Sequence, residues 1–94
     1  MEEEKSHKER KITGTIFPAR WDNEGKVTRL VIDTMDQDEY FIDQNKKGKE
    51  LFGFINHNVE VSGIVREDEE GHYIINVREY ALINNHHNNT KARA

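Results

Sequence analysis

Two stretches of mostly β-branched residues, ITGTI at 12–16 and VSGIV at 61–65, each contain a central glycine. Such residues favour strands, whereas glycine weakens a strand interior unless a bend, a bulge or a close backbone approach requires it. A polar turn containing Glu-Gly, at 24–25 and 70–71, follows each stretch and leads into another apolar segment. We therefore predict two equivalent bends in strands that coil around a closed barrel. The alternative is two unrelated hairpins that happen to contain glycine.

The apolar pattern of the remaining chain predicts one short helix between strands. Leu51, Phe52 and Ile55 are spaced i, i+1 and i+4, as on one face of a helix of about two or three turns. We expect this helix to end at Asn58. Pro18 lacks a backbone N–H, so we expect it at a strand end or a sheet edge. The expected strands are residues 12–17, 26–34, 40–43, 59–65 and 73–83, in the order β-β-β-α-β-β.

The chain has 94 residues, which fits a single domain. Segments 1–10 and 84–94 have too little apolar surface to offset their ordering entropy, so we expect disordered polar tails around a barrel at 11–83. Such a domain buries only about 60% of its chain surface, which leaves no room for a deep catalytic cleft. The predicted core residues are Ile12, Ile16, Leu30, Ile32, Ile42, Leu51, Ile55, Val59, Val61, Val65, Ile75 and Val77.

The composition limits the classes of function. Residues 11–83 contain nine basic and fourteen acidic side chains, a net charge of −5, which argues against a broad basic face for nucleic acid. Cysteine is absent, so disulfides and thiolate metal sites are excluded and a reducing, cytoplasmic location is expected. No apolar run is long enough for a membrane span. We expect a monomer without a membrane partner.

Three short motifs in the second half of the chain have fixed spacing. They are G-K-x-L at 48–51, V-x-V-x-G-x-V at 59–65 and I-x-V-x-x-Y at 75–80. Together with the element order, they resemble small stand-alone bacterial OB-fold proteins. The OB fold is a five-stranded Greek-key barrel that binds oligonucleotides and oligosaccharides. The resemblance covers residues 11–83 and implies a ligand that crosses strands two and three, flanked by the loops at 20–23 and 66–72.

The resemblance implies a binding face that includes Thr15, Phe17, Val27, Arg29, Val31 and Phe41. The candidate ligand-binding residues on this face and its loops are Phe17, Arg20, Trp21, Arg29, Phe41 and Arg66. Aromatic side chains can stack on bases, at about 1–3 kcal/mol per base, and Arg20, Lys26 and Arg29 can contact phosphates. This arrangement favours single-stranded DNA or RNA as the ligand.

Two further interpretations stay open. Four consecutive acids, residues 67–70, would repel a polyanion but suit a basic protein partner, which makes a protein-interaction domain the alternative function. In a purely structural interpretation, Phe17 and Phe41 plug the barrel ends, Trp21 caps an open end, and Arg29 is a solvated strand residue.

Metal and catalytic motifs are absent from the sequence. Asp33, Asp36, Asp38, Glu39 and Asp43 suggest calcium, but the segment 36–47 has Phe41 where an EF-hand needs glycine and Lys47 where it needs glutamate. Zinc sites need ligands that converge from fixed positions. His86 and His87 are adjacent in one expected tail and His7 lies in the other, while His57 and His72 are elsewhere, so we interpret the tail histidines as solvated. There is no nucleophile elbow and no glycine-rich phosphate loop. We expect no enzyme activity, no cofactor and no metal.

Overall fold

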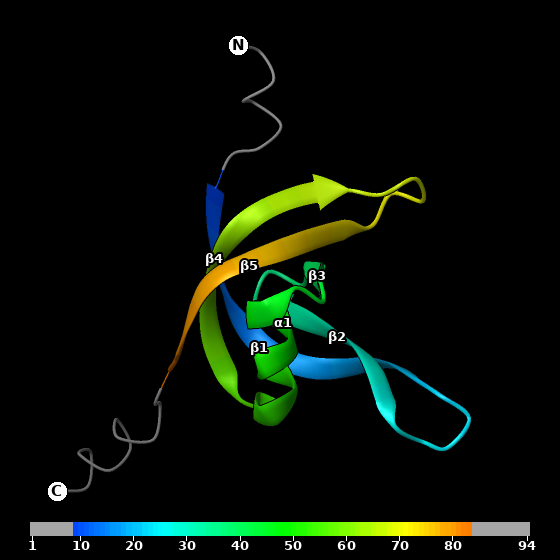
Figure 1. The fold of residues 1–94 in the computed structure, drawn as a ribbon. Helices are drawn as coiled ribbons and strands as arrows, with labels where there is room; N and C mark the ends of the chain where they lie inside the picture. Colours follow the sequence, from blue (N-terminus) through cyan, green and yellow to red (C-terminus); the bar gives the residue numbers. More distant parts are fainter. Residues whose placement is uncertain (1–8, 84–94) are drawn as a thin grey trace, which may run out of the picture.

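The computed structural model describes residues 9–83, which form a closed five-stranded barrel (Figure 1). One short helical segment between β3 and β4 completes the described chain, which confirms the predicted mainly β architecture and element order. The elements are β1 (Glu9–Trp21), β2 (Val27–Thr34), β3 (Glu39–Ile42), α1 (Lys46–Glu50), the 3₁₀ helix η2 (Leu51–Phe54), β4 (Asn58–Glu67) and β5 (Tyr73–Leu82).

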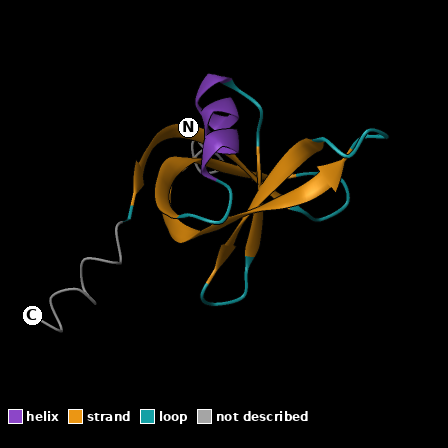
Figure 2. Ribbon diagram, turned by 90° about the horizontal axis from the view of Figure 1, so that it is seen from below, coloured by secondary structure: helices purple, strands orange, loops and turns teal. Residues whose placement is uncertain are grey.

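Around the barrel the strands follow the order β1-β2-β3-β5-β4. The long strand β1 pairs with β4 through its first half and with β2 through its second half. The parallel pairing of β3 with β5 closes the barrel, and the other pairs are antiparallel. The helical segment lies beside the strands (Figure 2), where α1 contacts β5.

The core lies inside this barrel and largely confirms the predicted residues. Ten of the twelve are buried, while Ile55 and Val65 are only partly buried against the core. Three further hydrophobic side chains, Val31, Tyr40 and Ile74, are also buried. Val31 has outward parity in β2, where its cross-strand neighbours are Phe17 and Phe41.

The two strand glycines are required by close approach of neighbouring backbones. A Cβ atom on Gly14 would overlap the carbonyl oxygen of Asp33, and one on Gly63 would overlap that of Asn76. Only Gly63 adjoins a register shift, where β5 carries one extra residue, Arg78, opposite Ser62 and Gly63. The predicted closed barrel is therefore confirmed, but close packing is common to both glycines and a bulge accompanies only one of them.

The turns after the two glycine-containing strands have the same construction. In each, an aspartate accepts hydrogen bonds on Oδ1 from the backbone N–H groups two and four residues later, all at 2.9 Å. The aspartates are Asp22 and Asp68. The glycines three residues later, Gly25 and Gly71, have φ values of 84° and 87°, which glycine adopts at little cost. The two hairpins share the sequence pattern D-x-E-G-x.

Several predicted boundaries were wrong. β1 starts at Glu9, so Glu9 and Arg10 of the expected N-terminal tail are in a strand; the rest of both expected tails, residues 1–8 and 84–94, lies outside the described residues. Pro18 is not a strand end, because β1 continues to Trp21; it does lie at an edge, where β1 pairs with β2 alone.

The helical segment is as short as predicted, but it ends earlier in the chain. It ends at Phe54, and Asn56, with a φ of 73°, turns the chain, whereas the predicted end residue Asn58 begins β4. Asparagine tolerates this left-handed conformation better than most residues. Within residues 9–83, no helix is both long enough and apolar enough to span a membrane.

Candidate ligand-binding face

A row of apolar side chains crosses the outer surface of three neighbouring strands. Phe17 of β1 is the cross-strand partner of Val31 in β2, which in turn is the partner of Phe41 in β3. Phe17 is 39% exposed and Phe41 is half-buried. Because the three residues have the same parity in their strands, the β pairing alone aligns them.

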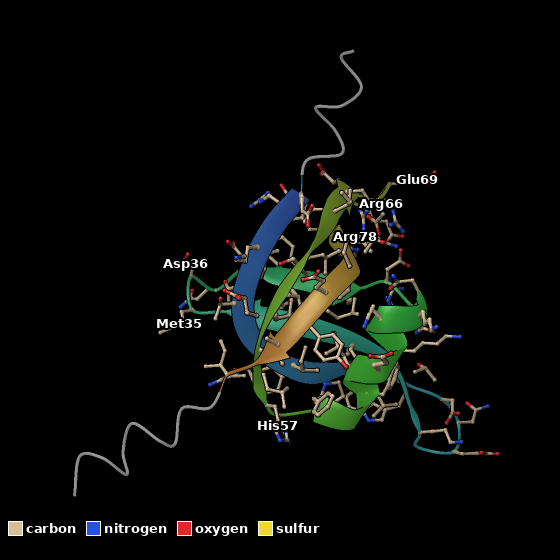
Figure 3. The ribbon with its side chains drawn as sticks, turned by 60° about the vertical axis from the view of Figure 1, so that its left-hand side comes forward. Met35, Asp36, His57, Arg66, Glu69 and Arg78 are labelled. Atoms are coloured by element: carbon tan, nitrogen blue, oxygen red, sulfur yellow. The ribbon has the colours of Figure 1, made fainter. Side chains whose placement is uncertain are left out.

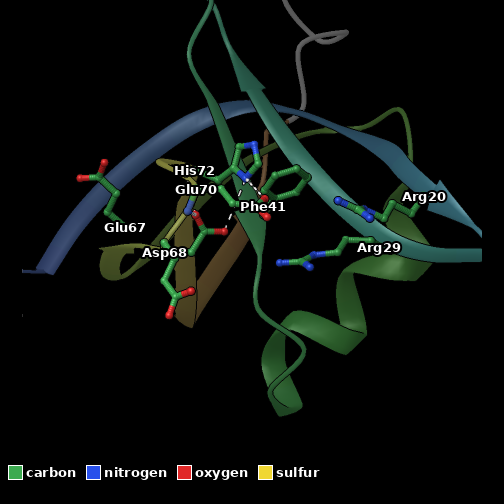
Figure 4. A pocket seen from close by; sticks show the side chains of 8 residues that line it. Arg20, Arg29, Phe41, Glu67, Asp68, Glu70 and His72 are labelled. Atoms are coloured by element: carbon green, nitrogen blue, oxygen red, sulfur yellow. Dashed lines mark hydrogen bonds and ion pairs between the residues drawn. The ribbon is translucent and has the colours of Figure 1, made fainter.

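An open cleft of about 550 Å³ lies at the Phe41 end of this row (Figure 4). Phe41 lies between two groups of charged side chains, with Arg20 and Arg29 on one side and the acidic β4–β5 turn on the other. The lining residues are Arg20, Arg29, Phe41, Glu67, Asp68, Glu69, Glu70 and His72. The cleft thus has charges of opposite sign on opposite sides of an aromatic ring.

Phe41 contacts one side chain from each charged side of the cleft, Arg29 and His72. The guanidinium carbon of Arg29 lies 4.8 Å from the centroid of the Phe41 ring, within cation–π distance. The His72 ring meets Phe41 edge-on, with centroids 5.3 Å apart and an interplanar angle of 89°. These contacts join Phe41 of β3 to Arg29 of β2 and to His72 at the end of the β4–β5 turn.

Backbone hydrogen bonds give the acidic side of the cleft a defined shape. The Asp68 carboxylate accepts bonds from the N–H groups of His72 and Glu70, and its own N–H donates to the His72 carbonyl at 2.9 Å. The backbone bond from His72, with a smaller contribution from Glu70, holds the pKa of Asp68 below its ordinary value. Asp68 therefore stays ionised and belongs to the turn itself, whereas Glu67, Glu69 and Glu70 are exposed.

The same turn contains three groups that could hold a metal ion. One ligand atom each from Asp68, Glu70 and His72 lies within 4.8 Å of the others. However, Asp68 is already engaged by the turn, and Glu70 and His72 are exposed. We therefore interpret these three residues as part of the charged lining of the cleft and not as a metal site.

Arg66 does not line the cleft with the other candidate arginines. Its guanidinium donates to Asp43 Oδ2 at 3.1 Å, and Asn76 Nδ2 donates to the same oxygen at 3.2 Å. Partial burial raises the pKa of Asp43, but these two hydrogen bonds and the charge of Arg66 outweigh it and lower the pKa below its ordinary value. Arg66 therefore belongs to a polar cluster between β3, β4 and β5.

A second hollow, of about 620 Å³, continues the face along the apolar row. It shares Arg20 and Phe41 with the cleft and extends past Val31 to Phe17, with Asp33 and Glu39 at its border. Met35 and Asp36, in the turn between β2 and β3, lie well away from Glu69 (Figure 3). The two hollows together form one groove across β1, β2 and β3.

The structure brings together four of the six candidate residues: Phe17, Arg20, Arg29 and Phe41. Trp21 is 56% exposed at the end of β1, and Arg66 pairs with Asp43. Val27, expected on the face, packs against the core because a register shift between Arg20 and Trp21 reverses the alternation of β2.

Sequence reasoning identified the acidic turn but missed the contact of His72 with Phe41. The only local signal for that contact is the position of the His72 ring next to a hairpin turn. This position does not indicate which side chain the ring contacts. Comparisons with protein-family models, curated proteins and solved structures found no match.

Proposed function

We propose that this protein is a non-enzymatic binding module whose groove across β1, β2 and β3 takes an extended segment of another protein. The segment would carry a basic side chain beside apolar ones. The observation that supports this proposal most directly is the composition of the groove. Six acidic side chains, Asp33, Glu39 and those of residues 67–70, border the apolar row, against two arginines, Arg20 and Arg29.

The charge of the groove favours a cationic side chain over a polyanion. Exposed charges interact over a Debye length of about 10 Å at 0.1 M salt, so the acidic turn acts on any ligand in the cleft. A lysine or arginine of the ligand would approach residues 67–70, while its apolar neighbours would cover Phe17 and Phe41. The two arginines would then donate hydrogen bonds to an acidic side chain or to backbone carbonyls of the same segment.

Single-stranded nucleic acid, the ligand expected from the sequence, is the second candidate. The observation that favours it is Arg29 lying over the Phe41 ring, with Arg20 in the same cleft. An arginine and an aromatic ring on one sheet surface provide a phosphate contact and a stacking platform. For this ligand the acidic turn would be repulsive.

We also infer an OB-type barrel, a bacterial origin and a cytoplasmic location. The strand order β1-β2-β3-β5-β4 with a helix between β3 and β4 supports the first inference, as do the glycines of β1 and β4. The motif resemblance supports the second. The third rests on the absence of cysteine.

NMR titration of the ¹⁵N-labelled protein at low salt tests the ligand class. The probes are a peptide of alternating lysine and leucine, the same peptide with glutamate in place of lysine, and an oligothymidine. The proposal expects the lysine peptide to shift amides of Phe17, Val31, Phe41 and the acidic turn, while the glutamate peptide does not. Absence of shifts on this face with the lysine peptide would refute the proposed function.

A variant that removes three negative charges from the acidic turn distinguishes the two candidate ligands, because it should change their affinities in opposite directions. Glu67→Gln, Glu69→Gln and Glu70→Gln together leave Asp68 in the turn. Exposed ion pairs contribute about 0.2–1 kcal/mol each, so the triple variant should weaken the lysine peptide on the order of tenfold. If nucleic acid is the ligand, the same variant should instead tighten oligothymidine binding. Glu24→Gln, at the position equivalent to Glu70 in the other hairpin, is the matched control and should change neither affinity.

A further inference from the structure

Within the cleft, the acidic turn and the two arginines have a self-complementary arrangement. A chain of contacts crosses the cleft from Asp68 through His72 and Phe41 to Arg29, with 3.5 Å between Asp68 Oδ2 and His72 Nδ1. Acidic groups therefore lie at one end of this chain and arginines at the other, with Phe41 between them (Figure 4).

The two charged groups do not neutralise each other within one chain. Among residues 9–83, neither Arg20 nor Arg29 forms an ion pair, and Glu67 and Glu69 form none either. Asp68 and Glu70 contact His72, so within the described residues the unpaired charges of the cleft are Glu67, Glu69 and the two arginines. Phe17 and Phe41 provide apolar surface beside them.

We propose that two copies of this chain associate face to face through the groove, as a two-fold symmetric dimer. In such an interface the same surface is used by both copies. A two-fold axis lying in the interface near Phe41, perpendicular to the line from the acidic turn to the arginines, brings each acidic turn onto the arginines of the other copy. The contact between acidic turn and arginines then forms twice, and the two Phe41 rings meet at the centre.

This dimer differs from the monomer expected from the sequence and does not depend on the class of ligand. It uses the same face as the proposed function, so the dimer and the ligand complex exclude each other. Self-association would then regulate the site, because a protein segment must displace the second copy before it can bind.

Sedimentation of the full chain over a range of concentrations, at low and at high salt, tests the proposal. We expect a monomer–dimer equilibrium whose dissociation constant rises with salt, since exposed ion pairs are screened. A chain that stays monomeric at every concentration at low salt would overturn the proposal.

Two charge-reversal variants identify the interface. One carries Arg20→Glu with Arg29→Glu, and the other carries Glu69→Arg with Glu70→Arg. Each variant alone places like charges opposite each other and should dimerise at least about tenfold more weakly. An equimolar mixture should form a heterodimer, because both contacts again join opposite charges. Recovery in the mixture also shows that both variants are folded.

A matched control and the remaining outcomes complete the test. Lys46→Glu with Lys49→Glu changes two exposed residues of α1 by the same total charge and should leave the dissociation constant unchanged. This interface would be excluded if either charge-reversal variant alone dimerised like the unmodified chain. It would also be excluded if their mixture formed no heterodimer. The lysine-peptide titration, run at a concentration where the chain is monomeric, reports on the proposed function independently of the dimer.

Discussion

At the scale of single residues, glycine is required where two strands approach too closely for a side chain. Gly63 lies in β4 against the carbonyl of Asn76 in β5, and Gly14 lies in β1 against the carbonyl of Asp33 in β2. Both residues are buried within strands. Their positions allow the strands to curve tightly enough to enclose a small core.

Substituting Gly63→Ala should therefore destabilise the barrel. The added methyl group forces the β4 and β5 backbones apart, and we expect the free energy of unfolding to fall by about 1–3 kcal/mol, as in other overpacked interiors. Gly53→Ala is the matched control, since its Cβ would meet nothing within 4 Å. Alanine there should leave stability unchanged or raise it by at most about 1 kcal/mol. Urea unfolding measures both, and equal losses in the two variants would contradict the close-approach argument.

At the scale of elements, the short helical segment depends on one side chain at its start. Asn45 Oδ1 accepts from the N–H of Gly48 at 3.1 Å and so caps α1. The same side chain donates through Nδ2 to the carbonyl of Val77 in β5 at 2.9 Å. A helix of five residues has little stability of its own, so this bridge to the sheet and the buried Leu51 hold it in place.

The two functions of Asn45 can be separated by substitution. Asn45→Ala removes both the cap and the bond to Val77, and we expect a loss of about 1–2 kcal/mol in the free energy of unfolding. Asn45→Asp retains the capping oxygen but not the donor, so its loss should be smaller. Urea unfolding gives both values, and hydrogen exchange at the Gly48 amide reports on the cap directly. If aspartate is as damaging as alanine, the cap contributes little.

At the scale of the whole molecule, the barrel closes through its shortest strand. β3 and β5 share three residue pairs, compared with nine between β4 and β5. Asp43, directly after β3, extends this closure through its backbone N–H, which donates to the Ile75 carbonyl at 3.0 Å. Its carboxylate joins β4 and β5 by accepting from Arg66 and Asn76.

Acid should weaken this closure. The pKa of Asp43 is lower in the folded chain than in the unfolded chain, so its contribution is complete above about pH 4 and is lost as the pH falls through the folded value. We expect Asp43→Asn to cost about 1–2 kcal/mol at pH 7 and progressively less below pH 4. Urea unfolding at a series of pH values measures this difference. In an Arg66→Gln background, the cost of Asp43→Asn should depend less on pH. A cost that stays the same at every pH would contradict the role of the Asp43 carboxylate in the closure.

Local backbone chemistry made much of this fold predictable from the sequence. Alternating apolar residues and paired turn signals act over a few neighbouring residues, so they located the strands, both hairpins and ten of the core residues. Local parity also placed Phe17 and Val31 on one outer surface. It failed at Val27, where a register shift that local alternation does not reveal reversed the direction of the side chains.

Only the tertiary structure decided which distant residues meet. The burial of Val31 requires the register of β1, β2 and β3 together, and the contact of His72 with Phe41 requires the β3–β5 closure. Arg66 likewise pairs with Asp43, 23 residues away, and not with the cleft. Sequence patterns specify the faces of each strand, whereas the register between distant strands is set by the packing of one shared core. That packing places the acidic turn opposite Arg20 and Arg29.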